Sequence, residues 1–265
     1  MKAALLALSS LPETIGRKIV PASELAGRSA PLLPTALPGL DDLLGGGLPR
    51  GALVELTAPG SCGRFAAGLA ALAAATQAGE AAALVDLGDH LDPQLAAAEG
   101  VDLTRLLWIR PRTLPQALVS AETAAAAGFP LVVLDLGLVP LRPRQSLAAA
   151  WLRLERAASS HRTALLVLSP SRASGPAARA VLSARARPAW SRTPRAFSIP
   201  LLEGVGTVLY ADKLRGRRPG QMASLSWRTA EAIVGGPAVS SCQAPATRDV
   251  LRAGTSRRAR HESLA

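Results

Sequence analysis

Long apolar runs are scarce in this sequence, and so are cysteines and histidines. The main apolar stretch, residues 65–79, is interrupted by Thr76 and Gln77 and is shorter than the roughly 20 apolar residues of a membrane span. The N-terminus has a brief apolar stretch at residues 3–8 but lacks the longer apolar core and the cleavage site of a secretory signal. We therefore expect a cytoplasmic protein that does not contact a membrane.

The few cysteines and histidines give no sign of a metal site or a disulfide framework. Cys62 and Cys242 are the only cysteines, and they lie far apart in the sequence. His90, His161 and His261 are also far apart and have no ligand spacing, so solvated or capping roles are favoured for them. The sequence therefore predicts a reducing compartment and no bound metal.

Acidic residues are scarce in the second half of the chain. Residues 1–135 contain 9 Lys and Arg against 13 Asp and Glu, whereas residues 136–265 contain 21 against 6. Only Lys2, Lys18 and Lys213 are lysines, so arginine carries the positive charge. Such a surface favours contact with nucleic acid. It also suits an acidic protein partner, or a solvated surface whose arginines reflect a GC-rich genome.

Apolar segments of strand length alternate with segments of helical character through most of the chain. The predicted strands are 52–56, 81–86, 106–109, 131–134 and 164–168. The predicted helices are a short one opened by Pro38 and Asp41, then 65–78, 93–99, 114–127 and 145–159. This alternation predicts an α/β fold with a mostly parallel central sheet flanked by helices. Strands at 180–185, 206–211 and 222–227 predict an antiparallel extension of that sheet.

Composition divides the chain into three parts. Residues 1–30 contain a weak helical repeat broken by Pro12, which predicts an N-terminal arm. Residues 31–232 hold the strands and helices and form the predicted core domain. Residues 233–265 are rich in Gly, Pro, Ser, Thr and Arg without periodicity, which predicts a flexible basic C-terminal tail.

A degenerate loop lies between an apolar strand and a helix, where a P-loop would bind phosphate. Its residues, TAPGSCGRF at 57–65, match the pattern G-x-x-x-x-G-K-[S/T] only at Gly63. Arg64 replaces the lysine with a bulky planar cation, and Phe65 replaces the hydroxyl that holds Mg²⁺. Residual ATP binding and a simple tight turn both remain compatible with these residues. The degenerate nucleotide site comprises Gly60, Ser61, Cys62, Gly63, Arg64, Phe65 and, from a later strand, Asp135.

The segments around this loop resemble the RecA family and its KaiC-type relatives. The resemblance is carried by LPGLDDLLGGGLPRGALVELTAPGSCG, LVDLGDHLDP, GVDLTRLLWIRP, LVVLDLGLVPL and LLVLSPSR. Asp135 lies in the segment that is similar to the Walker B strand. Farther on, LYADKLRGRRPGQMASLSW resembles the late strands of RecA, and Lys213 matches a lysine that in RecA reaches the nucleotide of a neighbouring subunit. The resemblance covers about residues 31–230 and implies a RecA-like P-loop fold.

The departures from the family pattern bear on catalysis. In an ungapped overlay, the water-activating glutamate falls on Gly88, with Asp89 one place late, and the glutamine that senses the γ-phosphate falls on Pro170. Phosphoryl transfer needs Mg²⁺ and a group that orients water. We therefore predict a pseudo-ATPase with no catalytic residues and no required cofactor, in which residual ATP binding at the helix N-terminus stays open. Asp135 is then expected to cap the segment that follows it.

The degenerate loop, the chain length, the short connections where RecA's DNA-binding loops would be, and the basic tail TSRRARHESLA resemble the ImuA family. That resemblance implies a non-catalytic, nucleoid-associated accessory protein of SOS-induced translesion synthesis. Its implied partners are an ImuB-like protein and a DnaE-type error-prone polymerase, with RecA and single-stranded DNA as further contacts and self-association as in other RecA-like folds. A DNA-stimulated RecA- or KaiC-like ATPase is the first alternative, and a SulA-like inhibitor of cell division is the second.

Basic residues supply the candidate contacts with DNA or a partner. Residues 142–195 contain 11 arginines and a single acid, Glu155. On the predicted helix 145–159, Trp151 and Leu154 pack inward while arginines face outward. Trp190 can stack on a base or pack in the core, and we favour the core. The candidate contacts are Arg153, Arg156, Arg185, Arg187, Arg192, Arg195, Lys213, Arg215, Arg217, Arg218, Arg257, Arg258 and Arg260.

Overall fold

The computed structural model describes residues 31–60, 62–138, 147–190, 202–216 and 220–228. Contacts between Cα atoms divide the chain into two units, Met1–Pro31 and Leu32–Ala265. The predicted arm at 1–30 and the predicted tail at 233–265 lie outside the described residues. Within the described residues, no helix combines the length and the apolar character that crossing a membrane requires.

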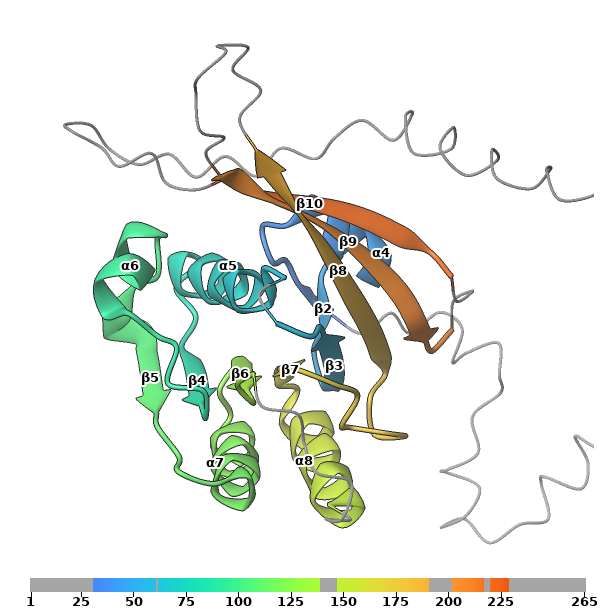
Figure 1. Cartoon of the computed structure of the whole chain (residues 1–265). Coiled ribbons are helices and arrows are strands. Elements are labelled where there is room, and N and C mark those ends of the chain that lie inside the picture. Colours follow the sequence, from blue (N-terminus) through green and yellow to red (C-terminus); the bar gives the residue numbers. More distant parts are fainter. Residues whose placement is uncertain (1–30, 61, 139–146, 191–201, 217–219, 229–265) are drawn as a thin grey trace, which may run out of the picture. The chain divides into compact units, whose positions relative to one another are not determined.

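Five adjacent parallel strands form one end of an eight-stranded sheet (Figure 1). They are β3 (Ala52–Thr57), β4 (Ala82–Asp86), β5 (Leu106–Ile109), β6 (Leu131–Asp135) and β7 (Ala164–Ser169). They lie in the order β3-β7-β6-β4-β5. Strands β3, β4, β6 and β7 are buried along their whole length, as expected of parallel strands covered on both faces. The predicted parallel sheet is confirmed.

Helices cover both faces of these strands and create two cores. The four predicted long segments form α5 (Arg64–Gln77), α6 (Pro93–Ala98), α7 (Leu114–Ala126) and α8 (Ala148–His161). Alternate residues of β3 separate the cores, since Val54 and Leu56 pack with α5 whereas Leu53 packs with α7 and α8. On α8, Trp151 and Leu154 are buried, as predicted. Figure 1 shows α5 on one side of the sheet and α7 and α8 on the other.

Three further strands widen the sheet beyond β3. They are β8 (Ala180–Trp190), β9 (Leu202–Leu214) and β10 (Met222–Arg228), and the complete order is β10-β9-β8-β3-β7-β6-β4-β5. The prediction that all three are antiparallel is wrong for β8, which pairs with β3 in parallel. The reason is that residues 170–179 carry the chain back along the sheet, so that β8 starts opposite Val54. Among the described strands of this sheet, the β8–β9 and β9–β10 pairs are antiparallel.

Short elements precede β3. Helix α4 (Pro38–Leu44) has a proline in its first turn and ends at Gly45, which adopts a left-handed conformation with φ 89°. Strands β1 (Leu32–Leu33) and β2 (Leu48–Pro49) pair as a separate two-stranded sheet. This pair was not predicted, because two residues are too few to show alternation. A 3₁₀ turn, η1 (Leu103–Arg105), leads into β5.

Candidate functional site

The C-terminal ends of β3, β4, β6 and β7 meet beside the loop that joins β3 to α5. We call residues 58–63 the β3–α5 loop. Parallel α/β sheets bind ligands at this edge, because loops from several strands converge there. The residues that reach it in this chain come from the start of α5, from the ends of β4 and β6, and from the segment after β4.

Arg64 occupies the centre of this edge and is 4% exposed. Its guanidinium donates to the carbonyl oxygens of Ala58 at 2.5 Å, Ser169 at 2.8 Å and Gly137 at 2.6 Å. These three carbonyls lie at the ends of β3, β7 and β6, so one side chain ties three strands together. Burial lowers the pKa of Arg64, and the nearby charge of Asp135 opposes that shift.

Trp227 of β10 covers the β3–α5 loop at Gly63. Gly63 has φ 73° and stands at the N-cap of α5, and a Cβ atom added there would overlap the indole of Trp227. The indole Nε1 donates to Thr207 Oγ1 at 3.2 Å, and that hydroxyl donates to the carbonyl of Cys62 at 2.9 Å. Strands β9 and β10, which carry Thr207 and Trp227, therefore hold the loop in place.

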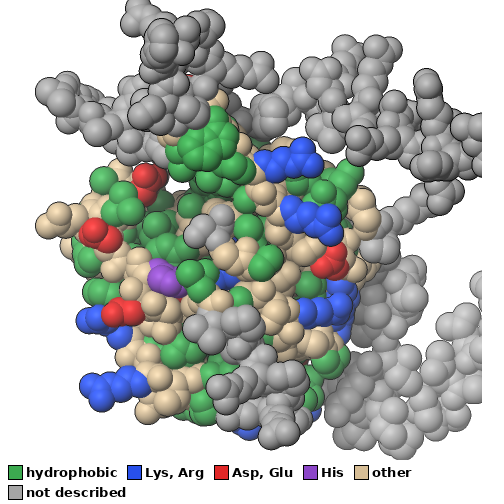
Figure 2. Space-filling model, viewed as in Figure 1, with side chains coloured by type: hydrophobic (Ala, Val, Ile, Leu, Met, Phe, Trp, Pro, Cys, Tyr) green, Lys and Arg blue, Asp and Glu red, His purple; other side chains and the backbone are tan. Residues whose placement is uncertain are grey.

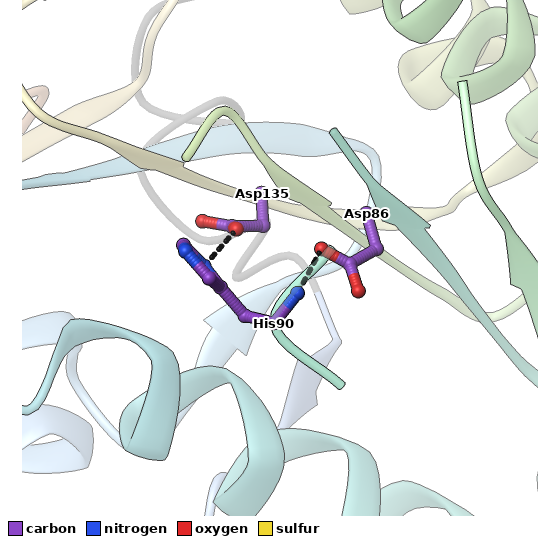
Figure 3. A group of neighbouring side chains, drawn as sticks. All are labelled: Asp86, His90 and Asp135. Atoms are coloured by element: carbon purple, nitrogen blue, oxygen red, sulfur yellow. Dashed lines mark hydrogen bonds and ion pairs between the residues drawn. The ribbon is translucent and has the colours of Figure 1, made fainter. Parts of the chain in front are cut away.

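Asp86, His90 and Asp135 form a second group at the same edge (Figure 3). Asp135 Oδ2 lies 2.8 Å from His90 Nδ1. Asp86 accepts from the backbone N–H of His90 at 3.0 Å and of Leu91 at 3.0 Å, and from Trp108 Nε1 at 3.3 Å. The expectation that His90 has a solvated or capping role is wrong, because its ring is paired with a carboxylate.

Asp135 was expected to cap the segment that follows it, but no N–H of the described residues 136–138 bonds its side chain, and that of Leu136 donates to the carbonyl of Leu168. Residues 139–146 lie outside the described residues. The Asp135 side chain is fully buried, and its Oδ1 has no hydrogen-bond partner among the described residues. Burial raises the pKa of Asp135, while the charges of His90 and Arg64 partly offset that rise.

Phe65 and Gly88 pack against the pair formed by His90 and Asp135. The ring of Phe65 meets the ring of His90 edge to face, with centroids 5.6 Å apart. A Cβ atom at Gly88 would lie 2.7 Å from Asp135 Oδ2, so the backbone there has no room for a side chain. Asp89 instead forms an exposed ion pair with Arg110 at 2.7 Å. The sulfur of Cys62 donates to the carbonyl of Pro59, nothing lies near the Cβ position of Gly60, and Ser61 is outside the described residues.

Known proteins match the chain over about half of its length. A family model of the RecA N-terminal domain matches residues 6–151. The chain belongs to the RecA family. The protein RecA of Nocardia farcinica is 38% identical over 137 residues, which make up 51% of this chain and 40% of that protein. The protein RecA of Acidothermus cellulolyticus is 42% identical over 114 residues, 43% of this chain and 33% of that protein. This RecA-family chain thus spans less than half the length of these curated relatives.

A solved structure of a RadB recombinase shares the fold. It aligns with a TM-score of 0.55 at 20% identity and covers 73% of this chain and 95% of that chain. The RecA-like architecture predicted from the sequence is therefore confirmed. The RecA-family match begins at residue 6, earlier than the predicted resemblance, and ends within α8.

The structure separates the predicted basic residues of this RecA-family chain into groups. Arg153 pairs with Glu122 at 3.3 Å, and Arg156 is exposed on the same helix. Lys213 and Arg215 donate to the carbonyl of Pro176, at 3.2 and 2.8 Å. The other predicted basic contacts are the exposed Arg185 and Arg187, and Arg192, Arg195, Arg217, Arg218, Arg257, Arg258 and Arg260, which lie outside the described residues.

Arg185 and Arg187 lie on one face of β8. They alternate with Ala184 and Ala186, which pack toward the core of α5, so the arginines point from the opposite face of the sheet. The guanidinium of Arg185 lies 5.3 Å from the ring centre of Tyr210 on β9. Figure 2 shows Lys and Arg gathered on the side of β8 and β9 in that view, whereas Asp and Glu lie mostly on the side of α6.

The prediction that Trp190 packs in the core is wrong. Its side chain is 53% exposed and does not pack in the core. The reason is that Thr57, the last residue of β3, pairs with Ser183, so the rest of β8 has only β9 as a neighbour. The far end of β8 therefore extends beyond the part of the sheet that the parallel strands support.

Glu55 is a buried residue that the sequence analysis did not single out. It accepts from Ser169 Oγ at 2.9 Å, from the backbone N–H of Ala173 at 2.6 Å and of Ser174 at 3.1 Å, and from Ser174 Oγ. These bonds fix the segment after β7 against β3. The signal was present, because a lone acid within the apolar strand ALVELT needs buried donors.

Proposed function

We propose that this chain is a RecA-fold accessory protein that does not hydrolyse ATP and acts by binding partners. The direction of the Arg64 side chain carries the proposal. An active P-loop directs its lysine at the β- and γ-phosphates, whereas the Arg64 guanidinium donates to three carbonyls of its own chain. Turning it toward a phosphate would take the Arg64 donor from the carbonyls of Ala58 and Gly137, at a cost of about 1–3 kcal/mol for each buried group. The Ser169 carbonyl would keep only the backbone N–H of Ala58.

The surrounding residues do not fit a magnesium-bound nucleoside triphosphate either. Phe65 stands where the hydroxyl ligand of Mg²⁺ would be, and it offers no ligand atom. The glutamate position is Gly88, where Asp135 and His90 fill the space that a side chain would need. Asp89 cannot substitute for that glutamate, since its carboxylate is paired with Arg110 at the surface.

The partner side of the proposal follows the resemblance to the ImuA family. The chain would join an ImuB-like protein and a DnaE-type error-prone polymerase in a complex for translesion synthesis in the cytoplasm. The exposed arginines of β8 and α8 support contact with DNA or with an acidic surface of such a partner, because charge complementarity steers association. Phosphate contacts would make the affinity fall steeply as salt rises.

The hydrolysis part is tested with the full chain, Mg²⁺ and ATP. Calorimetry should show no binding, and phosphate release should stay at background with and without single-stranded DNA, while an active RecA run in parallel turns over. DNA-stimulated release that disappears in Asp135→Asn would overturn the proposal and favour the ATPase alternative.

The partner part needs a separate measurement. In a pull-down at physiological salt, the purified chain should bind an ImuB-like protein or the polymerase. The double variant Arg185→Ala and Arg187→Ala should weaken that binding more than Arg105→Ala does. Arg105 serves as the control because it precedes β5, at the edge of the sheet far from β8. A direct complex with the division GTPase and no retention of either polymerase partner would instead favour the SulA-like alternative.

A further inference from the structure

We propose that Asp86, His90 and Asp135 bind a divalent transition metal of the zinc class without any nucleotide. One ligand atom from each of the three residues lies within 4.8 Å of the others. Figure 3 shows the carboxyl group of Asp135 facing the ring of His90, with Asp86 on the other side of the loop backbone. This inference is independent of whether the chain hydrolyses ATP.

Asp135 has a buried carboxylate oxygen without a partner among the described residues. The side chain is fully buried, and its Oδ1 accepts no hydrogen bond from any described residue. An ionised carboxylate in such a place requires compensation by a partner or a cation. Arg64 does not supply it directly, because its terminal nitrogens are bonded to the carbonyls of Ala58, Gly137 and Ser169.

The other oxygen of Asp135 and the His90 ring are spaced so that both could bind one ion. His90 Nδ1 and Asp135 Oδ2 are 2.8 Å apart. A metal held by both at bond lengths of about 2.0–2.1 Å would subtend an angle of roughly 90° between them. The ion would bind the lone pair of Nδ1, and the proton that now lies between the two atoms would move to Nε2 of the neutral imidazole. Asp86 would supply the third ligand, since one of its oxygens lies within 4.8 Å of the other two ligand atoms, and water would complete the shell.

The surroundings of the three residues resemble those of a metal site. Asp86 is oriented by the N–H groups of Leu91 and Trp108, which is the usual role of outer partners around a ligating carboxylate. The backbone of Gly88 packs directly against the His90 ring and the Asp135 carboxylate, where a Cβ atom would lie 2.6 Å and 2.7 Å from them. The His90 side chain is 30% exposed, whereas that of Asp135 is fully buried, so an ion enters from the His90 side.

Charge and ligand type select the ion. Asp86 and Asp135 carry two negative charges, and Arg64 is the one fixed cation that acts on Asp135 in this group. With His90 neutral, the group has a net charge of −1 and favours a cation. A ring nitrogen suits Zn²⁺ and its transition-metal neighbours, whereas Mg²⁺ prefers oxygen ligands only.

The test uses the full chain after removal of bound metal by a chelator. Zn²⁺ alone is titrated by calorimetry in the absence of nucleotide, and Co²⁺ absorption reports whether nitrogen and oxygen ligands surround the ion. We expect one Zn²⁺ site, a weaker response to Mg²⁺, and a rise in melting temperature on adding Zn²⁺. His90→Ala should weaken Zn²⁺ binding at least about tenfold and remove the rise in melting temperature.

Controls keep the result specific. His161→Ala changes a histidine at the end of α8, and Cys242→Ser removes a thiol, so neither should alter Zn²⁺ binding. His90→Gln provides a second variant if His90→Ala does not fold. Absence of Zn²⁺ binding would overturn the proposal, as would binding that survives both changes at His90. Equal affinity for Mg²⁺ and Zn²⁺ would also overturn it, because such a site would not use the imidazole.

Discussion

The Cα of Gly63 faces the indole of Trp227 so closely that no side chain fits between them. The two residues are far apart in the sequence, and they join the first loop of the parallel sheet to its last antiparallel strand. Gly63 also has φ 73°, a conformation that residues with a Cβ rarely adopt. Both the backbone and the indole therefore require glycine at this position.

Gly63→Ala should destabilise the chain by more than about 3 kcal/mol, because it adds a steric overlap to the cost of a left-handed backbone. Gly60→Ala is the matched control, since Gly60 has φ 68° and nothing within 4 Å of its Cβ position. That control should cost about 1–2 kcal/mol. Urea unfolding measures both. In a Trp227→Ala background the two alanine substitutions should cost the same amount, and equal costs in the native background would contradict the steric account.

Arg64→Met keeps most of the side-chain length of Arg64 and removes its donors. The buried carbonyls of Ala58 and Gly137 lose their donors, and that of Ser169 keeps only the N–H of Ala58, so we expect a loss of about 3–5 kcal/mol in the free energy of unfolding. Arg105→Met provides the comparison, because Arg105 bonds only exposed groups among the described residues, the carbonyl of Gly79 and the carboxylate of Asp102, and should cost less than about 1 kcal/mol. Similar midpoints of denaturation for the two variants would show that the three bonds contribute little.

Glu55→Gln replaces one acceptor oxygen by an amide group that cannot accept. The N–H groups of Ala173 and Ser174 then compete for a single oxygen, so the segment after β7 should loosen. Hydrogen exchange at these two amides should accelerate, with a loss of about 1–3 kcal/mol in stability. Glu80→Gln, which changes a surface pair with Arg50, should leave both amides protected. Unchanged exchange in Glu55→Gln would mean that other contacts fix the segment.

The Asp89–Arg110 pair gives a pH dependence with a definite sign. Bonding to Arg110 lowers the pKa of Asp89 below its ordinary value of 3.8. Because the folded-state pKa is depressed, the stabilisation is present above pH 3.8 and disappears as the pH falls through the folded value. Arg110→Ala should return the Asp89 pKa toward 3.8 in an NMR titration. Asp102, whose pKa is lowered mainly by Thr104, should not respond, and an unmoved Asp89 would rule out Arg110 as the cause.

The repetitive part of the fold could be predicted from the sequence because its signals are local. Each parallel strand is a short apolar run that ends at a polar residue or turn, and the helices between them have caps such as Asp92 and Thr113. The strand β5 has the predicted bounds, Leu106–Ile109. The degenerate positions Arg64, Phe65 and Gly88 were also visible as departures from a known spacing.

The contacts that define the candidate site depend on residues distant in the sequence, and no local pattern encodes them. Trp227 reaches Gly63 only because β9 and β10 fold back across the sheet. The pairing of His90 with Asp135 requires β4 and β6 to be neighbours, although β5 and α7 separate them along the chain. The sequence favours the core for Trp190, but β8 extends beyond β3 and leaves this side chain 53% exposed.

The arginine that joins the ends of β3, β6 and β7 has a consequence for control of the protein. A ligand changes the shape of a protein only if it binds one of two arrangements more tightly than the other. Since Arg64 supplies from inside the chain the positive charge that closes this edge, we expect the edge to keep a single arrangement. The energy state of the cell would then not change the structure of this edge. The number of copies of this protein that the cell makes would determine how many complexes form.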